Sequence, residues 1–377
     1  MLNRRQFLAG AVAVAGVRAA SPAPPPPSVI LIAIDDLGEW MTGVGGARYL
    51  RTPNLDSLAH SGTRFVHAFS AAPVAQAGFD ALLSGAPAGS ANTLDKVLAA
   101  RGYRIGSAVE GDMASVSGQL SSFLEQQKAG QPFCLIARYA PFREADKMAA
   151  KYTQPFANAD VTEIGWMPAA VNATDKKPFA DIVPHLREAA AVMAACDDQL
   201  PAVQAKLIQR GLIDNTLIVL AGTSGVLLGR HGLWGDGRAS TPPNMFDEVV
   251  GVPLIWNWAA GVPAGGVRPE VVSLCDVAPT ICELTGATVP QGPGRSLVHA
   301  VLDRKYPKKQ PWHDRAYAAL DGTLMARNAR YKLVQRVNGP NELYDLANDP
   351  REQRNQYEDQ QFLAVRADLA RELTTWK

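Results

Sequence analysis

The sequence predicts an α/β protein with a mostly parallel sheet covered by helices on both faces, followed by a small C-terminal α+β subdomain. Continuous apolar runs, which are typical of strands buried on both faces, alternate with helical stretches that end near a glycine. This alternation favours parallel strands joined by helical crossovers. The apolar runs are residues 29–34, 133–137, 216–221 and 252–256, and the helical stretches are residues 93–101, 183–210 and 277–284.

The composition is that of an ordinary globular protein with enough apolar material for a large core. The chain has 377 residues, of which 47% are hydrophobic and 19% charged, and this length allows one large domain with an appendage or two domains. The formal net charge of +1 argues against a tail that binds nucleic acid. The four cysteines show no zinc-binding spacing. Cys275 and Cys282 would lie about 10 Å apart on a helix, too far for a disulfide, so we expect free thiols.

The last part of the chain has a different pattern. Residues 331–337 are typical of a strand, residues 338–339 of a turn, and residues 361–376 of a terminal helix. We therefore expect a main domain over residues 29–310 and a small C-terminal subdomain over residues 311–377.

The N-terminal segment has the pattern of an export signal. Arg4 and Arg5 form a twin-arginine motif, and the apolar run that follows is too short to span a bilayer comfortably. We expect residues 1–19 to form a twin-arginine signal peptide and residues 20–28 a proline-rich linker. The alternative is a chance basic start before an uncleaved anchor. With cleavage, the protein would be periplasmic or secreted and would have no transmembrane anchor.

Two predicted strands end in residues that could form a site. In open parallel sheets, sites form at the carboxyl ends of the strands. The first strand ends in Asp35 and Asp36, whose oxygens are hard ligands suited to a cation, so these are the candidate metal ligands. The alternative is that Asp35 caps a turn and Asp36 faces solvent. The strand at residues 216–221 ends in Thr223 and Ser224, which carry no charge.

A series of short motifs follows in order along most of the chain, from about residue 29 to residue 355. Their order resembles the sulfatase family of the alkaline-phosphatase superfamily. The resemblance implies an alkaline-phosphatase/sulfatase-like fold for the main domain. The motifs are Ile34-Asp35-Asp36-Leu37-Gly38, residues 52–59 with 62–65, residues 228–235, residues 272–274 with 276–280, and residues 342–346 with 348–350.

The resemblance also implies a catalytic apparatus, and its nucleophile is missing here. In this family a cysteine in a Cys/Ser-x-Pro-x-Arg motif is oxidised to formylglycine, whose hydrate attacks sulfur, while calcium polarises a sulfate oxygen. The corresponding segment of this chain has Ala75 at the cysteine position, Ala77 at the proline and Phe79 at the arginine. A methyl group cannot act as a nucleophile.

Other positions implied by the resemblance are also substituted. With Thr223 and Ser224 in place of metal ligands, Asp35 and Asp36 supply far fewer oxygens than the about six to eight that calcium takes. We therefore expect either no cofactor or a weakly bound, calcium-like divalent cation. Elsewhere, Glu110 and Asp112 replace a lysine and a histidine, only Pro141 remains of a Lys-Pro-His-like motif, and Asp236 replaces a lysine.

These substitutions predict an exported sulfatase-family protein that is catalytically inactive and has a binding or scaffolding role. Its partner would be an anionic saccharide or a periplasmic protein, and not a nucleic acid. The alternative is a sulfuric-ester or phosphoester hydrolase with a relocated, non-formylglycine site. That site would use Asp35, Asp36 and a nearby hydroxyl, such as that of Ser70, Thr223 or Ser224.

Overall fold

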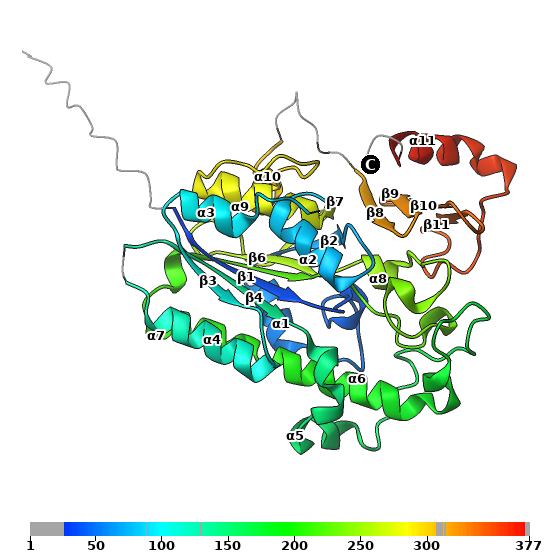
Figure 1. Ribbon diagram of the computed structural model, residues 1–377, viewed down its shortest axis with the longest axis horizontal. Helices are drawn as coiled ribbons and strands as arrows, with labels where there is room; N and C mark the ends of the chain where they lie inside the picture. Colours follow the sequence, from blue (N-terminus) through cyan, green and yellow to red (C-terminus); the bar gives the residue numbers. More distant parts are fainter. Residues whose placement is uncertain (1–25, 88, 129, 307–311, 313, 374–377) are drawn as a thin grey trace, which may run out of the picture.

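The computed structural model describes residues 26–87, 89–128, 130–306, 312 and 314–373, which form a central sheet between two layers of helices and a smaller sheet beside them (Figure 1). The predicted signal peptide and residues 20–25 of the predicted linker lie outside the described residues. Within the described part of the chain, no helix is long and apolar enough to cross a membrane.

The main sheet has seven strands in the order β3-β4-β1-β5-β6-β2-β7. Every neighbouring pair is parallel except those made by β6, which runs antiparallel to both β5 and β2. The prediction of a mostly parallel sheet is thus confirmed. The strands are β1 (Ser28–Ile34), β2 (Thr63–Phe69), β3 (Arg104–Ala108), β4 (Phe133–Tyr139), β5 (Thr216–Gly222), β6 (Leu254–Asn257) and β7 (Gly266–Ser273).

Helices cover both faces of this sheet, and the central strand β1 shows why. Its residues alternate between two apolar clusters, with Ile30, Ile32 and Ile34 in one and residues 29, 31 and 33 in the other. The first cluster includes α1 (Pro53–His60), α4 (Met113–Glu125), α6 (Ile182–Asp197) and α7 (Leu200–Gln209), and the second includes α2 (Ala75–Ser84), α3 (Leu94–Ala100), α9 (Val277–Thr285) and α10 (Val298–Val301) (Figure 1).

Short helices lie between the longer elements of the main domain and of the C-terminal part, and all four cysteines are buried and free, as predicted. The short α-helices are α5 (Ala150–Thr153) and α8 (Asp247–Val250), and the 3₁₀ helices are η1 (Glu39–Met41), η2 (Pro141–Lys147), η3 (Gln154–Phe156), η4 (Lys177–Ala180), η5 (Ile213–Asn215), η6 (Arg230–Gly232), η7 (Gly237–Ala239), η8 (Leu274–Asp276) and η9 (Gln360–Phe362).

The single long helix predicted over residues 183–210 is wrong, because the structure divides this stretch into α6 and α7. Pro201 lies in the first turn of α7, where proline is tolerated, whereas inside a continuous helix it would remove a backbone hydrogen bond. The break places Asp197 at the end of α6, where its carboxylate accepts from the backbone N–H groups of Asn54 and Leu55, each at 2.9 Å. Asp197 thereby ties α6 to the first turn of α1.

The C-terminal part forms an antiparallel sheet in the order β11-β10-β9-β8, covered by α11 (Leu363–Leu373) (Figure 1). The predicted strand and terminal helix correspond to β10 and α11. An apolar cluster that includes Phe69 and Val271 from the main sheet and Met325 and Val334 from the small one joins the two sheets. The strands are β8 (Ala316–Leu320), β9 (Thr323–Arg327), β10 (Tyr331–Arg336) and β11 (Glu342–Asp345).

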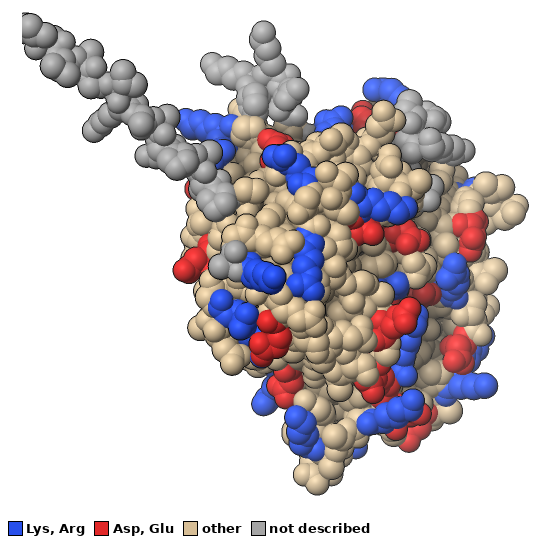
Figure 2. All heavy atoms as spheres, turned by 60° about the vertical axis from the view of Figure 1, so that its left-hand side comes forward, with Lys and Arg blue, Asp and Glu red and all other residues tan. Residues whose placement is uncertain are grey.

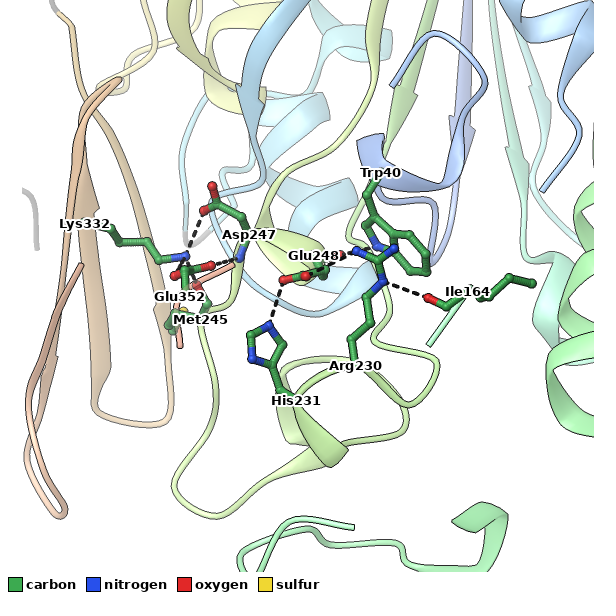
Figure 3. A network of polar contacts seen from close by, with 9 residues as sticks. All are labelled: Trp40, Ile164, Arg230, His231, Met245, Asp247, Glu248, Lys332 and Glu352. Atoms are coloured by element: carbon green, nitrogen blue, oxygen red, sulfur yellow. Dashed lines mark hydrogen bonds and ion pairs between the residues drawn. The ribbon is translucent and has the colours of Figure 1, made fainter. Parts of the chain in front are cut away.

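A buried ion network also fastens the small sheet to the main domain (Figure 3). The ammonium of Lys332, which is 0% exposed, donates to the carboxylate of Asp247 at 2.8 Å and to the carbonyl of Met245 at 2.6 Å, and also pairs with Glu352. Burial lowers the pKa of Lys332, but the two carboxylates more than offset it, so the pKa is raised overall. Lys332 therefore stays charged, as a buried ion with paired neighbours can.

The outer surface carries charges of both signs. On the face shown in Figure 2, lysine and arginine side chains alternate with aspartate and glutamate, and neither sign forms a continuous field. This agrees with the net charge of +1 and gives no indication of a nucleic-acid-binding face.

Candidate functional site

The two candidate metal ligands follow β1 but face different surroundings. The backbone N–H of Asp35 donates to the carbonyl of Tyr139 at 2.8 Å, so the pairing of β1 with β4 continues by one residue. Asp35 is 2% exposed. Asp36 has φ of +56°, a left-handed conformation that turns the chain sharply after the strand. The two carboxylates therefore point into separate environments.

Asp35 is held by an arginine that the sequence analysis did not single out. Arg138 lies on the neighbouring strand β4, where it pairs with Ala33 of β1. Its Nε donates to Oδ1 of Asp35 at 2.9 Å and to Oδ2 at 3.2 Å. The hydroxyl of Thr223, just after β5, donates to Oδ1 at 2.8 Å. Only 3% of the Asp35 side chain and 13% of the Arg138 side chain are exposed, so this is a buried ion pair.

The same guanidinium reaches the start of α2. Nη1 of Arg138 donates to Oε1 of Gln76 at 2.8 Å, and the guanidinium lies 4.4 Å from the ring centre of Phe79. Its Nη2 is buried and has no hydrogen-bond partner among the described residues. Arg138 thus joins the ends of β1, β4 and β5 to the first turns of α2, which begins at Ala75. These are the segments that the family resemblance places around one site.

The residues around Asp35 do not fit a calcium ion. Calcium takes about six to eight oxygen ligands, whereas both oxygens of Asp35 accept hydrogen bonds from Arg138, and Thr223 also donates to one of them. A guanidinium also cancels the negative charge that would attract a cation. In the part of the chain that the structure describes, no three histidine, cysteine, aspartate or glutamate side chains are grouped so as to hold a metal.

Asp36 lines a separate pocket of about 400 Å³, called the Asp36 pocket below. Burial, followed by the negative charges of Asp35 and Asp236, raises the pKa of Asp36 to about 7, and a hydrogen bond from Ser224 opposes this rise. None of the described residues that line this pocket is a lysine or arginine, so it does not favour an anion. Its polar and aromatic lining consists of Asp36, Phe142, His185, Glu188, Trp234 and Asp236.

Comparisons with known protein families agree with this arrangement of segments. Residues 27–107 match the family described as Sulfatase. Residues 229–377 match the family described as N-sulphoglucosamine sulphohydrolase, C-terminal. The chain belongs to the sulfatase family.

Individual relatives show how far the likeness extends. The N-acetylglucosamine-6-O-sulfatase of Bacteroides thetaiotaomicron is 28% identical over 182 residues, which are 45% of this chain and only 32% of that sulfatase. The phosphonate monoester hydrolase of Agrobacterium radiobacter matches with a TM-score of 0.76 at 18% identity, and the match covers 93% of this chain and 95% of the hydrolase chain. A protein solved with its substrate D-glucosamine-2-N,6-O-disulfate has a TM-score of 0.75 at 18% identity, with 93% and 97% covered. At these identities the structural likeness establishes the fold.

Not every acidic residue expected at the sulfatase site lies there. Asp236 lines the Asp36 pocket, as expected. Asp112 instead caps α4, because its carboxylate accepts from the backbone N–H of Ser115 at 2.8 Å. Glu110 is exposed and, like Asp112, does not line the pocket. Two of the three expected charge reversals therefore lie outside the lining of this pocket.

The hydroxyls considered for a relocated sulfatase site are fully buried. Ser70, Thr223 and Ser224 are each 0% exposed. Ser70 donates to the carbonyl of Thr223 at 2.7 Å, and Thr223 donates to the ion-paired Asp35. Ser224 differs from them, because it donates to Asp36 at 3.3 Å and Asp36 lines the pocket. Of these three hydroxyls, that of Ser224 alone bonds to a carboxylate that lines a pocket.

Proposed function

We propose that this protein is a non-hydrolysing member of the sulfatase family that binds an anionic saccharide. The observation that carries the proposal is the Arg138–Asp35 ion pair. The resemblance to the family implies that a carboxylate after the first strand belongs to a calcium site. Here that carboxylate forms an ion pair with an arginine. Ala75 occupies the position of the nucleophile in the same region.

The size of the expected defect follows from the missing groups. Losing one electrostatic donor to the transition state typically costs about 10²–10³ in rate, and losing general acid–base assistance costs about 10²–10⁴. Loss of the nucleophile removes the covalent route altogether. Asp36 and Asp236 add negative charge beside the site. The missing catalytic groups and the added negative charge together support binding without turnover.

Export by the twin-arginine route is part of the proposal. It is supported by Arg4 and Arg5, which precede an apolar run. A periplasmic or secreted location would place the protein where polymeric acidic saccharides are accessible. The proposed partner is such a saccharide, and a periplasmic protein is the alternative partner.

The test combines metal analysis with a hydrolysis screen on the purified protein. We expect no stoichiometric calcium by plasma mass spectrometry, and no release of product from 4-nitrophenyl sulfate, sulfated glucosamine or aryl phosphonate monoesters. The assays contain added calcium, and an active sulfatase serves as the positive control. Calcium-dependent turnover that disappears in Asp35→Ala would refute the proposal.

The Ser224–Asp36 pair favours a second candidate function, a sulfuric-ester or phosphoester hydrolase with relocated chemistry. A carboxylate with a pKa of about 7 is suited to general-base catalysis near neutral pH. The burial of Ser224 argues against it, because the hydroxyl would have to become exposed to reach a substrate. Turnover that is independent of calcium and is abolished in both Asp36→Asn and Ser224→Ala would support this candidate over binding alone.

A further inference from the structure

A second concave region lies on the other side of the loop that borders the Asp36 pocket. Leu228 and Trp234 from this loop line the Asp36 pocket, whereas Arg230 between them lines two other hollows of about 340 and 400 Å³. The two hollows share Glu163, Ile164, Arg230 and Arg351 in their linings, so they adjoin and make up one region of the surface. We call it the arginine groove, and it is defined by Trp40, Arg48, Tyr49, Glu163, Trp166, Arg230 and Arg351.

Arg230 is held rigidly in this groove (Figure 3). Its Nε donates to the carbonyl of Ile164 at 2.9 Å, and its guanidinium lies 3.8 Å from the ring centre of Trp40. One of its terminal nitrogens contacts the carboxylate of Glu248 at 3.4 Å. With these contacts, 33% of the Arg230 side chain still remains exposed. The fixed, partly exposed guanidinium is prepared to bind an anion without much further loss of entropy.

Glu248 offsets the charge of Arg230, so the net positive charge of the groove comes from its other arginines. Its carboxylate, 12% exposed, lies between Arg230 and Nε2 of His231, which is 3.2 Å away (Figure 3). Burial raises the pKa of Glu248, but His231 and Arg230 lower it further than burial raises it. Glu248 is therefore ionised, and its charge serves to orient Arg230 and His231.

Two further arginines line the groove without an acidic partner. Arg48 and Arg351 are exposed, and neither side chain has a hydrogen bond or ion pair with another described residue. Arg351 is close enough to lower the pKa of Arg230, after the larger effect of burial. The exposed Glu163 opposes these charges, but it interacts with Tyr49, whose pKa it raises. The three arginines of the groove outnumber its two carboxylates, Glu163 and Glu248, and this excess of positive charge favours an anionic ligand.

Exposed apolar side chains lie beside these arginines. Trp166 is 66% exposed and Met167 is 41% exposed, and both line the same hollow as Arg230 and Arg351. An indole this exposed contributes little to a core, whereas its flat face suits the apolar face of a sugar ring. Arginine binds carboxylate and sulfate groups through paired hydrogen bonds. The combination matches a ligand that carries both sugar rings and negative groups.

We propose that the arginine groove, and not the Asp36 pocket, binds an acidic oligosaccharide. The inference rests on the proposed function as a non-hydrolysing binding protein, and it names the site. The Asp36 pocket is lined by Asp36, Glu188 and Asp236, which repel such a ligand. The arginine groove offers a charge of the opposite sign and an aromatic face.

Calorimetric titration of the purified protein tests the site. The probes are a heparin-derived octasaccharide with sulfates and carboxylates, a hyaluronan octasaccharide with carboxylates only, neutral maltooctaose and hexaglutamate. We expect binding of one or both acidic saccharides and none of maltooctaose. Comparison of the first two probes shows whether sulfate or carboxylate is preferred. Binding of hexaglutamate with equal affinity would overturn the assignment to a saccharide, as would binding of no saccharide.

Variants then locate the binding. Arg48→Ala/Arg351→Ala should weaken affinity about tenfold, since each exposed ion pair contributes only modestly to binding. Trp166→Ala should weaken it separately. Arg304→Ala/Lys305→Ala is the matched control, because it removes two exposed cations outside the groove and should leave affinity unchanged. All these side chains are exposed, so thermal melts should match the wild type.

The outcomes distinguish the two proposals. If binding persists in the groove variants and is lost in Trp234→Ala of the Asp36 pocket, the groove proposal is wrong and the binding function stands. If the protein hydrolyses a bound sulfated saccharide, the binding-only function is wrong, whichever residues hold the ligand.

Discussion

Replacing Arg138 should destabilise the protein far more than replacing a comparable arginine that has no acidic partner. Arg138→Met keeps much of the side-chain length but leaves Asp35 buried with one neutral donor, Thr223. Breaking one side of a buried ion pair typically costs about 3–5 kcal/mol. Loss of the contact with Phe79 adds about 0.5–2 kcal/mol. We therefore expect the free energy of unfolding to fall by about 3.5–7 kcal/mol.

The chain contains a matched control for this experiment. Arg104 also lies beside a phenylalanine, 5.2 Å from the ring centre of Phe123, and donates to Gln126 at 2.8 Å, but it forms no ion pair with a described residue. Both hydrogen bonds to Gln126 are exposed, so Arg104→Met should cost about 1.5–2 kcal/mol, near the lower end of the sum for a ring contact and two hydrogen bonds. Urea unfolding followed by circular dichroism measures both variants against the wild type.

A second variant separates the ion pair from simple packing. Arg138→Met/Asp35→Asn removes both charges, and replacing a whole buried pair is often nearly neutral. We expect this double variant to recover at least half of the loss seen in Arg138→Met. Equal losses in Arg138→Met and Arg104→Met, or no recovery in the double variant, would refute the argument that Arg138 neutralises a buried carboxylate.

Three further outcomes are expected. Burial and neighbouring carboxylates raise the pKa of Asp36 to about 7, above its unfolded value of about 3.9, so the folded state keeps a proton that the unfolded chain releases. The contribution of Asp36 to stability therefore falls as pH rises from about 4 to 7, and urea unfolding of Asp36→Asn should show a flatter profile. Ala75→Cys should give no sulfatase turnover even with calcium and a co-expressed formylglycine-generating enzyme, because Arg138 still occupies Asp35; measurable aryl-sulfate hydrolysis would contradict this. Arg4→Lys/Arg5→Lys should leave precursor in the cytoplasm on immunoblots of cell fractions, and normal periplasmic delivery would contradict the route.

The sequence predicted four inner strands of the sheet and missed the inner strand β2 and both edge strands, because the missed strands lack a continuous buried run. The strands β1, β4 and β5 are buried on both faces, and their continuous apolar runs identify them. The strands β3 and β7 form the two edges, and their residues alternate between buried and exposed or are polar, so no such run exists. The antiparallel direction of β6 depends on long-range pairing, which no local pattern specifies.

The candidate site was predictable only in part. The order of motifs correctly implied that Asp35, Thr223 and the start of α2 lie together. Arg138 was missed because its partner Asp35 is 103 positions away in the chain. One signal was available, since an arginine inside the apolar strand 133–139 needs a buried partner. The arginine groove could not be predicted, because its residues come from distant loops.

The different surroundings of Asp35 and Asp36 show why two adjacent carboxylates alone do not identify a metal site. A carboxylate buried as deeply as Asp35 requires a positive partner, and either a cation or an arginine can meet that requirement. Arg138 meets it here, and its contact with Gln76 on α2 holds it in place. No described arginine lies within hydrogen-bond distance of Asp36, and burial together with the charges of Asp35 and Asp236 raises its pKa. The same pair of residues that would hold an ion in a catalytic centre therefore supports, in this protein, a structural ion pair and an acidic pocket.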